Sequence, residues 1–308
     1  MENNMLDFRI HTFLAVCEQM SITKAASVLN LTQPAVTQHM QALQQQLGTS
    51  LFTMVGRRLQ LTEEGKKLRR FAQSIQVDIG RFVEEDLVPP KERPIRFGAT
   101  LTIGEFTLPG ILDSIMGIHP EKSLSMVVDN TENLLKMLDS GSIDFAFIEG
   151  AFDKSLYGYE LFSHERFVPI CSKACLARHA NPSLEELCGE RLLVREKGSG
   201  TRAVFEQILA ERGLTVEAFS HIDEIGNLNV IKHLVRQDRG ISFLYEAAAS
   251  DMLLAHEVFE LPIEGWHVQR EFNFVHPLHS RFTVQSLDFF TECVAIHSSW
   301  RRNSTNSS

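Results

Sequence analysis

The sequence predicts an α/β protein that carries a separate helical domain at its N-terminus. Apolar residues recur at helical spacing through residues 1–88, and from Pro94 onward short apolar strands alternate with longer helical segments. Pro89 and Pro90 lie between the two parts, where they are expected to end any helix that reaches them. A chain of 308 residues is long enough for two or three folding units.

Composition excludes several classes of protein. With 44% apolar and 22% charged residues, the chain is neither disordered nor collagen-like nor a small disulfide-stapled domain. It has no stretch of about 18 uncharged apolar residues, so no membrane span is expected. The N-terminus lacks the basic and apolar regions of a secretory signal. Five scattered cysteines, an odd number, favour a reducing compartment, and we expect a cytoplasmic protein.

The net charge of −9 is unevenly distributed along the chain. Residues 1–91 hold 10 Lys and Arg against 9 Asp and Glu, whereas residues 92–308 hold 20 against 30. The acidic excess therefore belongs to the second part. For this reason the charge of the whole chain does not argue against a nucleic-acid partner for the first part.

Residues 6–48 predict three short helices. Residues 21–23 supply capping side chains, the second helix is expected to run from Thr23 to Leu29 with Asn30 at its end, and Thr32 can cap the third. Pro34 is tolerated because it falls in the first turn of that third helix, which Gly48 ends. The first helix carries a single apolar stripe, formed by Leu6, Ile10, Phe13, Leu14 and Cys17.

The third helix has two different faces. The face expected to point inward consists of Val36, Met40, Leu43 and Leu47. The opposite face is polar and almost uncharged, and it consists of Gln33, Pro34, Thr37, Gln38 and Gln41. Gln and Thr side chains both donate and accept hydrogen bonds, which suits contact with base edges in a major groove. An ordinary solvated helix face is the alternative.

A basic loop follows the third helix. The chain returns to the core at Leu51, and Arg57 and Arg58 are expected in a loop before Leu59. A tight helix pair, a polar helix face and a basic loop are together typical of a winged helix-turn-helix domain. We therefore expect the polar face of the third helix to contact bases of double-stranded DNA. Phosphates are expected to be held by Thr32, Arg57 and Arg58.

Residues 62–88 predict a long amphipathic helix. Its apolar residues are separated alternately by four and three positions, as in a coiled-coil seam. They are Leu68, Ala72, Ile75, Ile79 and Phe82. We expect this helix to pair with its copy in a second chain, and the alternative is that it packs on the domain that follows.

Several runs in this first part resemble LysR-type transcriptional regulators. They are residues 21–26 (SITKAA), 29–37 (LNLTQPAVT), 47–48 (LG), 51–52 (LF) and 61–65 (LTEEG). Two positions depart from the family pattern, because Gln44 stands where Glu is common and Met54 where Arg is common. The resemblance implies a DNA-binding domain at 1–62, a linker and dimerisation helix at 63–91, an effector-binding domain at 92–302 and a polar tail at 303–308. It also implies a homo-oligomer on promoter DNA, usually a homotetramer built as a dimer of dimers.

The pattern from Pro94 onward predicts mostly parallel sheets with right-handed crossovers. Ligands in such sheets bind at the carboxyl ends of the strands. The expected strands are 95–99, 124–128, 143–148, 167–171, 192–194, 241–244 and 272–275. The expected helices are 103–118, 131–139, 202–212, 228–236 and 283–296.

Three strand–helix junctions carry polar residues. They are 100–102, 129–131 and the glycine-rich loop 198–202. Hydroxyl groups, free backbone N–H groups and a helix dipole make each junction a candidate anion site, to which Arg195 or Arg202 could add positive charge. For each junction taken alone, ordinary helix capping is the alternative.

The resemblance implies how these junctions come together. LysR-type effector domains are similar to periplasmic binding proteins, which hold a ligand between two α/β lobes. Here the first lobe would be 92–166 with 269–302 and the second 167–268, with hinges near 167–170 and 269–272. The family's effector contacts map onto Thr100, Thr102, Thr131, Ser199, Gly200, Thr201 and Arg202. The loop is similar to those of subfamilies that take a small anionic effector.

The remaining motifs do not predict an enzyme or a metalloprotein. His276 and His279 are separated by a proline and lack further ligands, so no metal or cofactor is expected. No phosphate-binding loop, dinucleotide fingerprint or Gly-x-Ser-x-Gly motif is present. Two alternatives stay open. One is a redox-responsive LysR-type regulator that uses Cys171 and Cys175, and the other is a solute-binding protein, which would have no use for residues 1–65.

Overall fold

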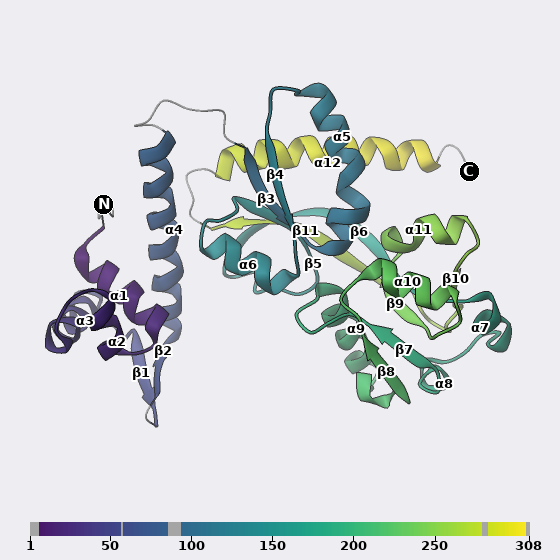
Figure 1. Cartoon of the computed structure of the whole chain (residues 1–308), viewed down its shortest axis with the longest axis horizontal. Helices are drawn as coiled ribbons and strands as arrows, with labels where there is room; N and C mark the ends of the chain where they lie inside the picture. Colours follow the sequence, from purple (N-terminus) through teal and green to yellow (C-terminus); the bar gives the residue numbers. More distant parts are fainter. Residues whose placement is uncertain (1–5, 57, 86–93, 279–282, 306–308) are drawn as a thin grey trace. The chain divides into compact units, whose positions relative to one another are not determined.

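The computed structural model describes residues 6–56, 58–85, 94–278 and 283–305 (Figure 1). The chain divides into two compact units. One comprises 1–93, 139–142 and 277–284, and the other comprises 94–138, 143–276 and 285–308. Among the described residues, every helix is too short or too polar to cross a membrane.

The first unit contains three short helices, a hairpin and a long helix. In chain order these are α1 (Phe8–Gln19), α2 (Ile22–Val28), α3 (Gln33–Leu47), β1 (Phe52–Val55), β2 (Arg58–Leu61) and α4 (Glu63–Glu85). The side chains of Asp7, Ser21 and Thr32 accept hydrogen bonds from backbone N–H groups in the first turns of α1, α2 and α3. Gly48 ends α3 with a φ of +67°. The predicted starts and ends of α2 and α3 are therefore confirmed to within a residue or two.

The core of this unit lies between α1, α2 and α3. Ala25 and Ala26 on α2 are buried, and their small side chains let α2 pack closely on its neighbours. Val36, Met40 and Leu43 point into the core as expected. Leu47 is 45% exposed, so the prediction that it points inward is wrong. Residues 45–48 are all exposed, which means that the last turn of α3 extends beyond the core.

The hairpin replaces the predicted loop. β1 pairs antiparallel with β2, with Phe52 opposite Leu61 and Val55 opposite Arg58. Arg58 therefore begins a strand, and its assignment to a loop is wrong. Arg57 lies outside the described residues.

α4 begins where the chain leaves the hairpin. The Thr62 hydroxyl accepts from the Gly65 N–H at 3.0 Å and donates to the Ser50 carbonyl at 2.7 Å. Leu68 and Ala72 pack against the core of this unit, and Ala72 is only 2% exposed. Ala72 is thus unavailable to a second chain, and its assignment to a dimer seam is wrong.

The second unit contains the α/β part. Its first half comprises β3 (Ile95–Ala99), the π-helical segment η1 (Ile103–Thr107), α5 (Leu108–Ile118), β4 (Leu124–Val128), α6 (Thr131–Asp139), β5 (Phe145–Glu149), β6 (Tyr157–Cys171), α7 (Lys173–Arg178) and α8 (Leu184–Leu187). Its second half comprises β7 (Arg191–Val194), α9 (Gly200–Glu211), η2 (Val216–Ala218), β8 (His221–Glu224), α10 (Leu228–Arg236), β9 (Ser242–Tyr245), α11 (Glu246–Leu254), β10 (Phe259–Glu260), β11 (Gln269–Pro277) and α12 (Thr283–Thr305).

The prediction of mostly parallel sheets is only partly right. β3 pairs parallel with β4 and β5, and β7 pairs parallel with β8. β11 pairs antiparallel with β5, and β6 pairs antiparallel with β9 and β10. The strand order β10-β6-β11-β5-β3-β4 places the long strands β6 and β11 side by side in the middle of one sheet. These two strands carry the chain from one lobe to the other and back, without the crossover helix that parallel pairing needs.

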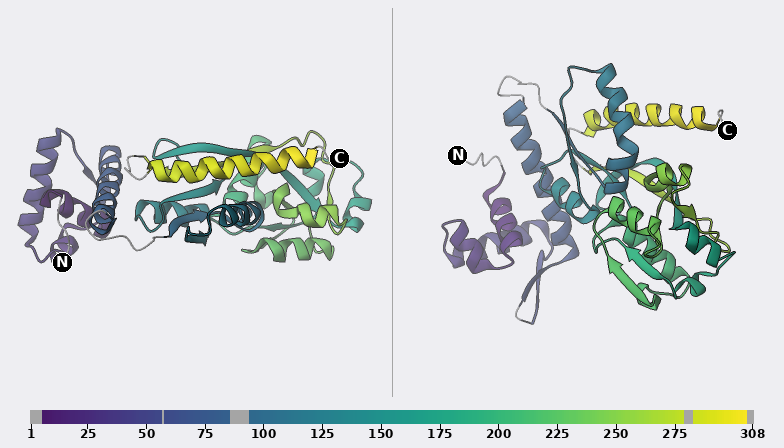
Figure 2. Two further views of the ribbon diagram at one scale, coloured as in Figure 1. Left: turned by 90° about the horizontal axis from the view of Figure 1, so that it is seen from above. Right: turned by 45° about the vertical axis from the view of Figure 1, so that its right-hand side comes forward.

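Phenylalanine rings fill the core of the first lobe. Phe97 and Phe145 stack with their ring centroids 5.3 Å apart, and Phe274 and Phe289 lie 4.9 and 5.4 Å from Phe145. Phe289 comes from α12, which runs beside these strands in both views of Figure 2. α12 continues to Thr305, so residues 303–305 of the expected polar tail are helical, while 306–308 lie outside the described residues.

Candidate functional site

The polar face of α3 is exposed as predicted. Gln33, Pro34, Gln38 and Gln41 are exposed, and Thr37 is half-buried, with its hydroxyl donating to the Gln33 carbonyl at 3.0 Å. On the opposite side, the Thr12 hydroxyl of α1 lies 3.0 Å from His39 Nδ1 of α3. The Phe8 and His39 rings also meet edge to face at 4.7 Å. α1 therefore fixes the orientation of α3. Sequence reasoning did not single out His39, because a lone histidine on a polar helix carries no signal.

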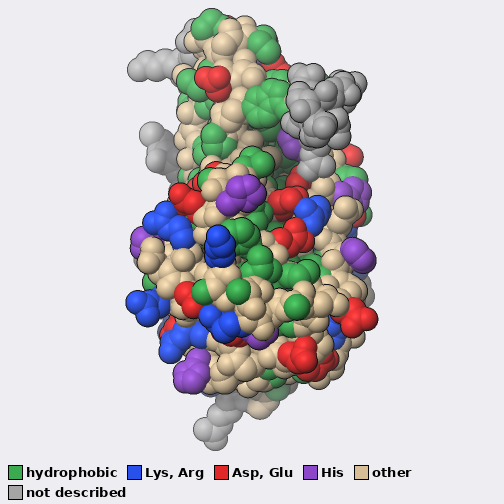
Figure 3. All heavy atoms as spheres, turned by 90° about the vertical axis from the view of Figure 1, so that its right-hand side faces the viewer, with side chains coloured by type: hydrophobic (Ala, Val, Ile, Leu, Met, Phe, Trp, Pro, Cys, Tyr) green, Lys and Arg blue, Asp and Glu red, His purple; other side chains and the backbone are tan. Residues whose placement is uncertain are grey.

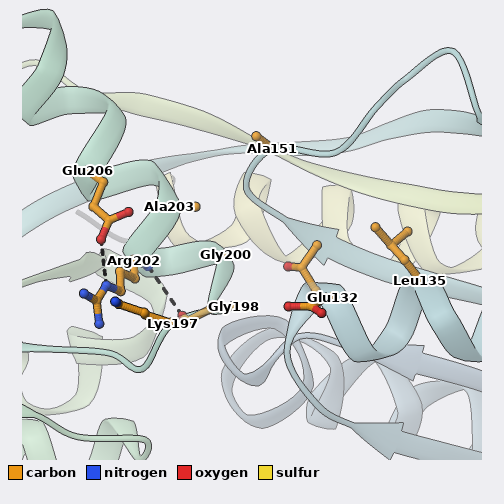
Figure 4. A pocket seen from close by; sticks show the side chains of 11 residues that line it. Glu132, Leu135, Ala151, Lys197, Gly198, Gly200, Arg202, Ala203 and Glu206 are labelled. Atoms are coloured by element: carbon orange, nitrogen blue, oxygen red, sulfur yellow. Dashed lines mark hydrogen bonds and ion pairs between the residues drawn. The ribbon is translucent and has the colours of Figure 1, made fainter. Parts of the chain in front are cut away.

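A second candidate site is a cavity of about 370 Å³ in the α/β unit (Figure 4). The N-terminus of α6, the loop before α9 and the first turns of α9 line it. Four of the seven predicted effector contacts line the cavity: Thr131, Ser199, Gly200 and Arg202. The other three, Thr100, Thr102 and Thr201, are at most 2% exposed and do not line it.

Arg202 does not present its charge to the cavity as expected. Its guanidinium donates to Glu206 at 2.7 Å, to Glu224 at 2.5 Å and to the Arg195 carbonyl at 3.0 Å. Arg195 forms its own ion pair with Glu196 at 2.8 Å. The prediction that Arg202 or Arg195 supplies free positive charge is therefore wrong. Figure 4 shows Lys197 on the α9 side of the cavity and the Glu132 carboxylate on the α6 side, so charges of both signs border it.

Glu149, at the end of β5, connects the predicted contacts. Its side chain is 1% exposed, and Oε1 accepts a hydrogen bond from the Thr201 hydroxyl at 2.5 Å. Its backbone carbonyl accepts from the Thr131 hydroxyl at 3.1 Å, and its backbone N–H donates to Thr100 Oγ1 at 3.3 Å. Three of the predicted residues thus converge on one glutamate that the sequence analysis did not include.

Two glycines let the lobes touch at this point. A Cβ on Gly200 would collide with the Glu149 carbonyl oxygen and would lie 2.9 Å from the Thr131 hydroxyl. Gly150 has a φ of +86°, and a Cβ there would lie 2.8 Å from the Gly200 Cα. The backbone after β5 and the N-terminus of α9 therefore meet more closely than any side chain would permit.

Polar atoms around Glu149 lack partners. Thr102 Oγ1, Glu149 Oε2, Arg195 Nη1 and the Tyr245 hydroxyl are all buried and have no hydrogen-bond partner within the described part of the chain. Burial raises the pKa of Glu149, although the hydrogen bond from Thr201 and the charge of Arg195 oppose that rise. Burial, and then the charge of Glu149, also raise the pKa of Tyr245. Buried polar atoms are ordinarily satisfied, so this cluster has unused capacity to bind a polar molecule.

The sequence did contain a signal for Glu149. The residue directly follows the apolar run expected to form a strand at 143–148, and it lies at the carboxyl end of that strand. Unlike the three polar junctions, this one does not lead into a helix, because Gly150 begins a loop. The alternative of a redox pair gains no support, because the Cys171 and Cys175 thiols are free and at most 1% exposed.

Family models match both parts of the chain. Residues 9–66 match the bacterial regulatory helix-turn-helix protein of the lysR family, and residues 90–295 match the LysR substrate binding domain. The HTH-type transcriptional regulator YeiE of Escherichia coli (strain K12) is 29% identical over 258 residues, which cover 83% of this chain and 85% of YeiE.

Solved structures share the fold. Full-length LysG from Corynebacterium glutamicum with bound effector Arg has a TM-score of 0.63 at 18% identity, over 95% of this chain and 98% of that one. The regulatory domain of CcmR from Synechocystis PCC6803 in complex with 2-PG has a TM-score of 0.59 at 21% identity, over 66% of this chain and 97% of that one. The helix-turn-helix match leaves no support for a solute-binding protein without a transcriptional role. The chain belongs to the LysR family of transcriptional regulators.

Proposed function

We propose that this regulator reads promoter DNA through the exposed face of α3 and senses a small polar effector bound beside Glu149. It acts in the cytoplasm as a homo-oligomer, a dimer of dimers, in which α4 pairs two chains. The observation that carries the effector site is the convergence of Thr100, Thr131 and Thr201 on a buried glutamate next to unpaired polar atoms.

Base reading is assigned to Gln33, Pro34, Thr37, Gln38 and Gln41. Four of these residues are exposed on one helix face, whose opposite side packs into the core of the first unit. Phosphate contacts are assigned to Thr32, Arg57 and Arg58. Arg58 is exposed on the hairpin, where its charge reaches a backbone without reading sequence.

Two variants separate these roles. Gln38→Ala should lower discrimination between the preferred base pair and its alternatives by about 1–3 kcal/mol, because a base-edge contact is lost. Arg58→Ala should weaken binding to all sequences alike and reduce the salt slope by about one. The measurement is gel retardation of the full-length chain at several salt concentrations, on duplexes that the unmodified chain selects from a random library.

Gln46→Ala is the matched control, because Gln46 is exposed at the far end of α3 and outside the assigned set. Equal effects of Gln38→Ala and Arg58→Ala on every duplex would contradict the role assignment.

The expected effector class changes once Glu149 is included. The unpaired oxygen atom of the buried Glu149 carboxyl group can accept a hydrogen bond, which a purely anionic ligand does not donate, and the Arg202 guanidinium is already held by Glu206 and Glu224. The N-terminus of α9, with Lys197 beside it, still suits an anionic group. The effector therefore carries both a carboxylate for α9 and a hydrogen-bond donor, an amine or hydroxyl, for Glu149.

A thermal-shift screen tests this effector class. The probes are α-amino acids, each matched with the corresponding α-hydroxy acid and unsubstituted carboxylic acid. We expect the amino or hydroxy acid to raise the melting temperature of the full-length chain more than its unsubstituted counterpart does. Glu149→Gln should remove that difference, and Thr102→Val should abolish the shift, while both variants keep DNA binding. Glu105→Gln, at an exposed position, is the control. Equal shifts from unsubstituted acids or inorganic anions would contradict the proposal.

A further inference from the structure

We infer that Cys175, His179 and Glu190 form a binding site for a thiophilic divalent cation, of which Zn²⁺ is the natural probe. The three residues lie in the second lobe, and none of them lines the cavity beside α9. No metal was expected from the sequence, where His276 and His279 lack further ligands. Cys175 and His179 stand apart from Glu190 along the chain, and folding brings the three side chains together.

The donor atoms of these residues already lie together. The Cys175 sulfur, a His179 ring nitrogen and a Glu190 carboxylate oxygen are all within 4.8 Å of one another. Cys175 is on α7, and His179 follows the last residue of that helix, one turn further along. Glu190 directly precedes β7, and its Oε1 lies 2.9 Å from His179 Nε2.

These separations are close to those of a zinc site. Zinc binds cysteine sulfur at about 2.3 Å, and histidine nitrogen and carboxylate oxygen at about 2.0–2.2 Å. Two atoms on one tetrahedral zinc therefore lie roughly 3.3–3.8 Å apart. The three donors need to move by roughly an ångström, which side-chain rotation supplies without displacing α7 or β7. Three protein ligands leave one tetrahedral position for water.

The surrounding charges permit the site. A Cys175 thiolate and the Glu190 carboxylate together balance a divalent cation, with His179 neutral. Arg178 is the cation that competes for Glu190, and it lies 3.4 Å from that carboxylate. Its stronger partner is Asp238, at 2.9 Å, which also accepts from the Ser172 hydroxyl at 2.6 Å. Arg178 thus keeps a partner when Glu190 turns to a metal.

Access to the donor atoms also fits. Cys175 is 1% exposed, whereas the His179 and Glu190 side chains are 21% and 23% exposed, so an ion enters from their side. Figure 3 shows the face of the molecule on the α7 side, where His, acidic and basic side chains lie among one another.

A bound ion would tie α7 to the start of β7 and stabilise the second lobe by mass action. The alternative is that His179, Glu190, Arg178 and Asp238 form an ion-pair network only. In that case added metal has no specific effect on stability and produces no thiolate-dependent spectrum.

The test uses the full-length chain, reduced and freed of metal by a chelator, and titrated with Co²⁺ as a spectroscopic probe before displacement by Zn²⁺. We expect one equivalent of Co²⁺ to give tetrahedral d–d absorption and a thiolate-to-cobalt charge-transfer band. One equivalent of Zn²⁺ should remove both and raise the melting temperature. Cys175→Ser should eliminate the charge-transfer band, and His179→Gln and Glu190→Gln should each weaken Co²⁺ binding at least tenfold.

Cys188→Ser is the matched control, since it removes a half-buried thiol outside the cluster and should bind Co²⁺ like the unmodified chain. If Cys175→Ser does not fold, the partly exposed His179→Gln variant carries the test, with its circular dichroism compared before metal is added. No endpoint at one equivalent, or a charge-transfer band that survives Cys175→Ser, overturns the site. The outcome is independent of the effector proposal, because none of the substituted residues lines the cavity beside α9.

Discussion

Glu149 unites residues that the sequence placed in three separate junctions. Hydroxyl groups at Thr100, Thr131 and Thr201 were expected from the polar residues that follow strands, and each contacts Glu149. The sequence could not show that Arg202 is already paired with Glu206 and Glu224, since those contacts join residues up to 22 positions apart. Residue types were therefore predictable, while the charge available to a ligand was not.

The Glu149 carboxyl should make stability depend on pH. Burial raises its pKa in the folded chain above the ordinary value of 4.5. Between these two values the unfolded chain has released the proton and the folded chain keeps it, so stability falls as pH rises, at up to about 1.4 kcal/mol per pH unit. Glu149→Gln removes this term. Urea unfolding of both proteins from about pH 5 to about pH 7 should show the variant gaining relative stability as pH rises. A difference that is constant with pH would contradict a raised pKa.

Gln44, which departs from the family pattern, connects α3 to the start of the hairpin. Its side-chain oxygen accepts from the backbone N–H groups of Leu51 and Phe52, at 2.7 and 3.4 Å. Amide and carboxylate oxygens can both accept such hydrogen bonds. The presence of Gln rather than Glu at position 44 is therefore compatible with this connection between α3 and the hairpin.

Among the elements, α4 depends on one close approach to the rest of its unit. A Cβ on Gly65 would collide with the backbone carbonyl of Leu51. The sequence placed Gly65 after a capping threonine, but only the fold shows that Leu51 lies against it. The predicted bounds of α6 and α10 were accurate, because capping residues and apolar spacing are local signals. The helix predicted at 283–296 continues to Thr305, and the one predicted at 103–118 begins with a π-helical segment. Short elements such as β8 and β10 were missed, because their residues lack an apolar pattern of strand length.

Gly65→Ala should destabilise the first unit by about 1–3 kcal/mol, because a backbone atom cannot yield to the new methyl group. Gly80→Ala, in the same helix with no atom near its Cβ position, should instead stabilise by about 0.5–1 kcal/mol. The free energy of unfolding from urea denaturation checks both values. Destabilisation by both substitutions to the same degree would show that helix propensity, rather than the Leu51 contact, governs the site.

The whole molecule combines a near-neutral DNA-reading part with an acidic effector part. Residues 92–308 carry 30 acidic against 20 basic residues, and we expect this excess of negative charge to repel DNA and leave contact to the first unit. The charge distribution along the sequence predicted this division, the alternation of strands and helices predicted the α/β class, and the resemblance to LysR-type regulators implied the two lobes. The alternation overestimated the number of parallel strand pairs, because strand pairing depends on where β6 and β11 lie in the sheet. Pairing between strands that are far apart in the sequence cannot be predicted from the residues of either strand alone.

Beyond the single chain, α4 is expected to pair two copies of the protein. Since Ala72 lies in the core of its own unit, the seam between two copies of α4 is expected further along, at Ile75, Ile79 and Phe82. Ile79→Glu should shift the sedimentation coefficient toward that of a single chain, because a charge would be buried in the seam. It should also weaken binding to DNA that carries two half-sites more than to DNA that carries one. Gln76→Glu, at an exposed position, is the control. Unchanged sedimentation of Ile79→Glu would place the interface elsewhere.

The contact between Gly150 and Gly200 has a consequence for genetics. Neither position can accept a side chain while the two backbones touch, since the added carbon would lie within 3.0 Å of backbone atoms in the other lobe. A single codon change at either glycine therefore wedges the lobes apart without altering any residue that reads DNA. A selection for strains whose reporter no longer responds to the inducer should return mutations at these two codons, and such alleles should still occupy the promoter.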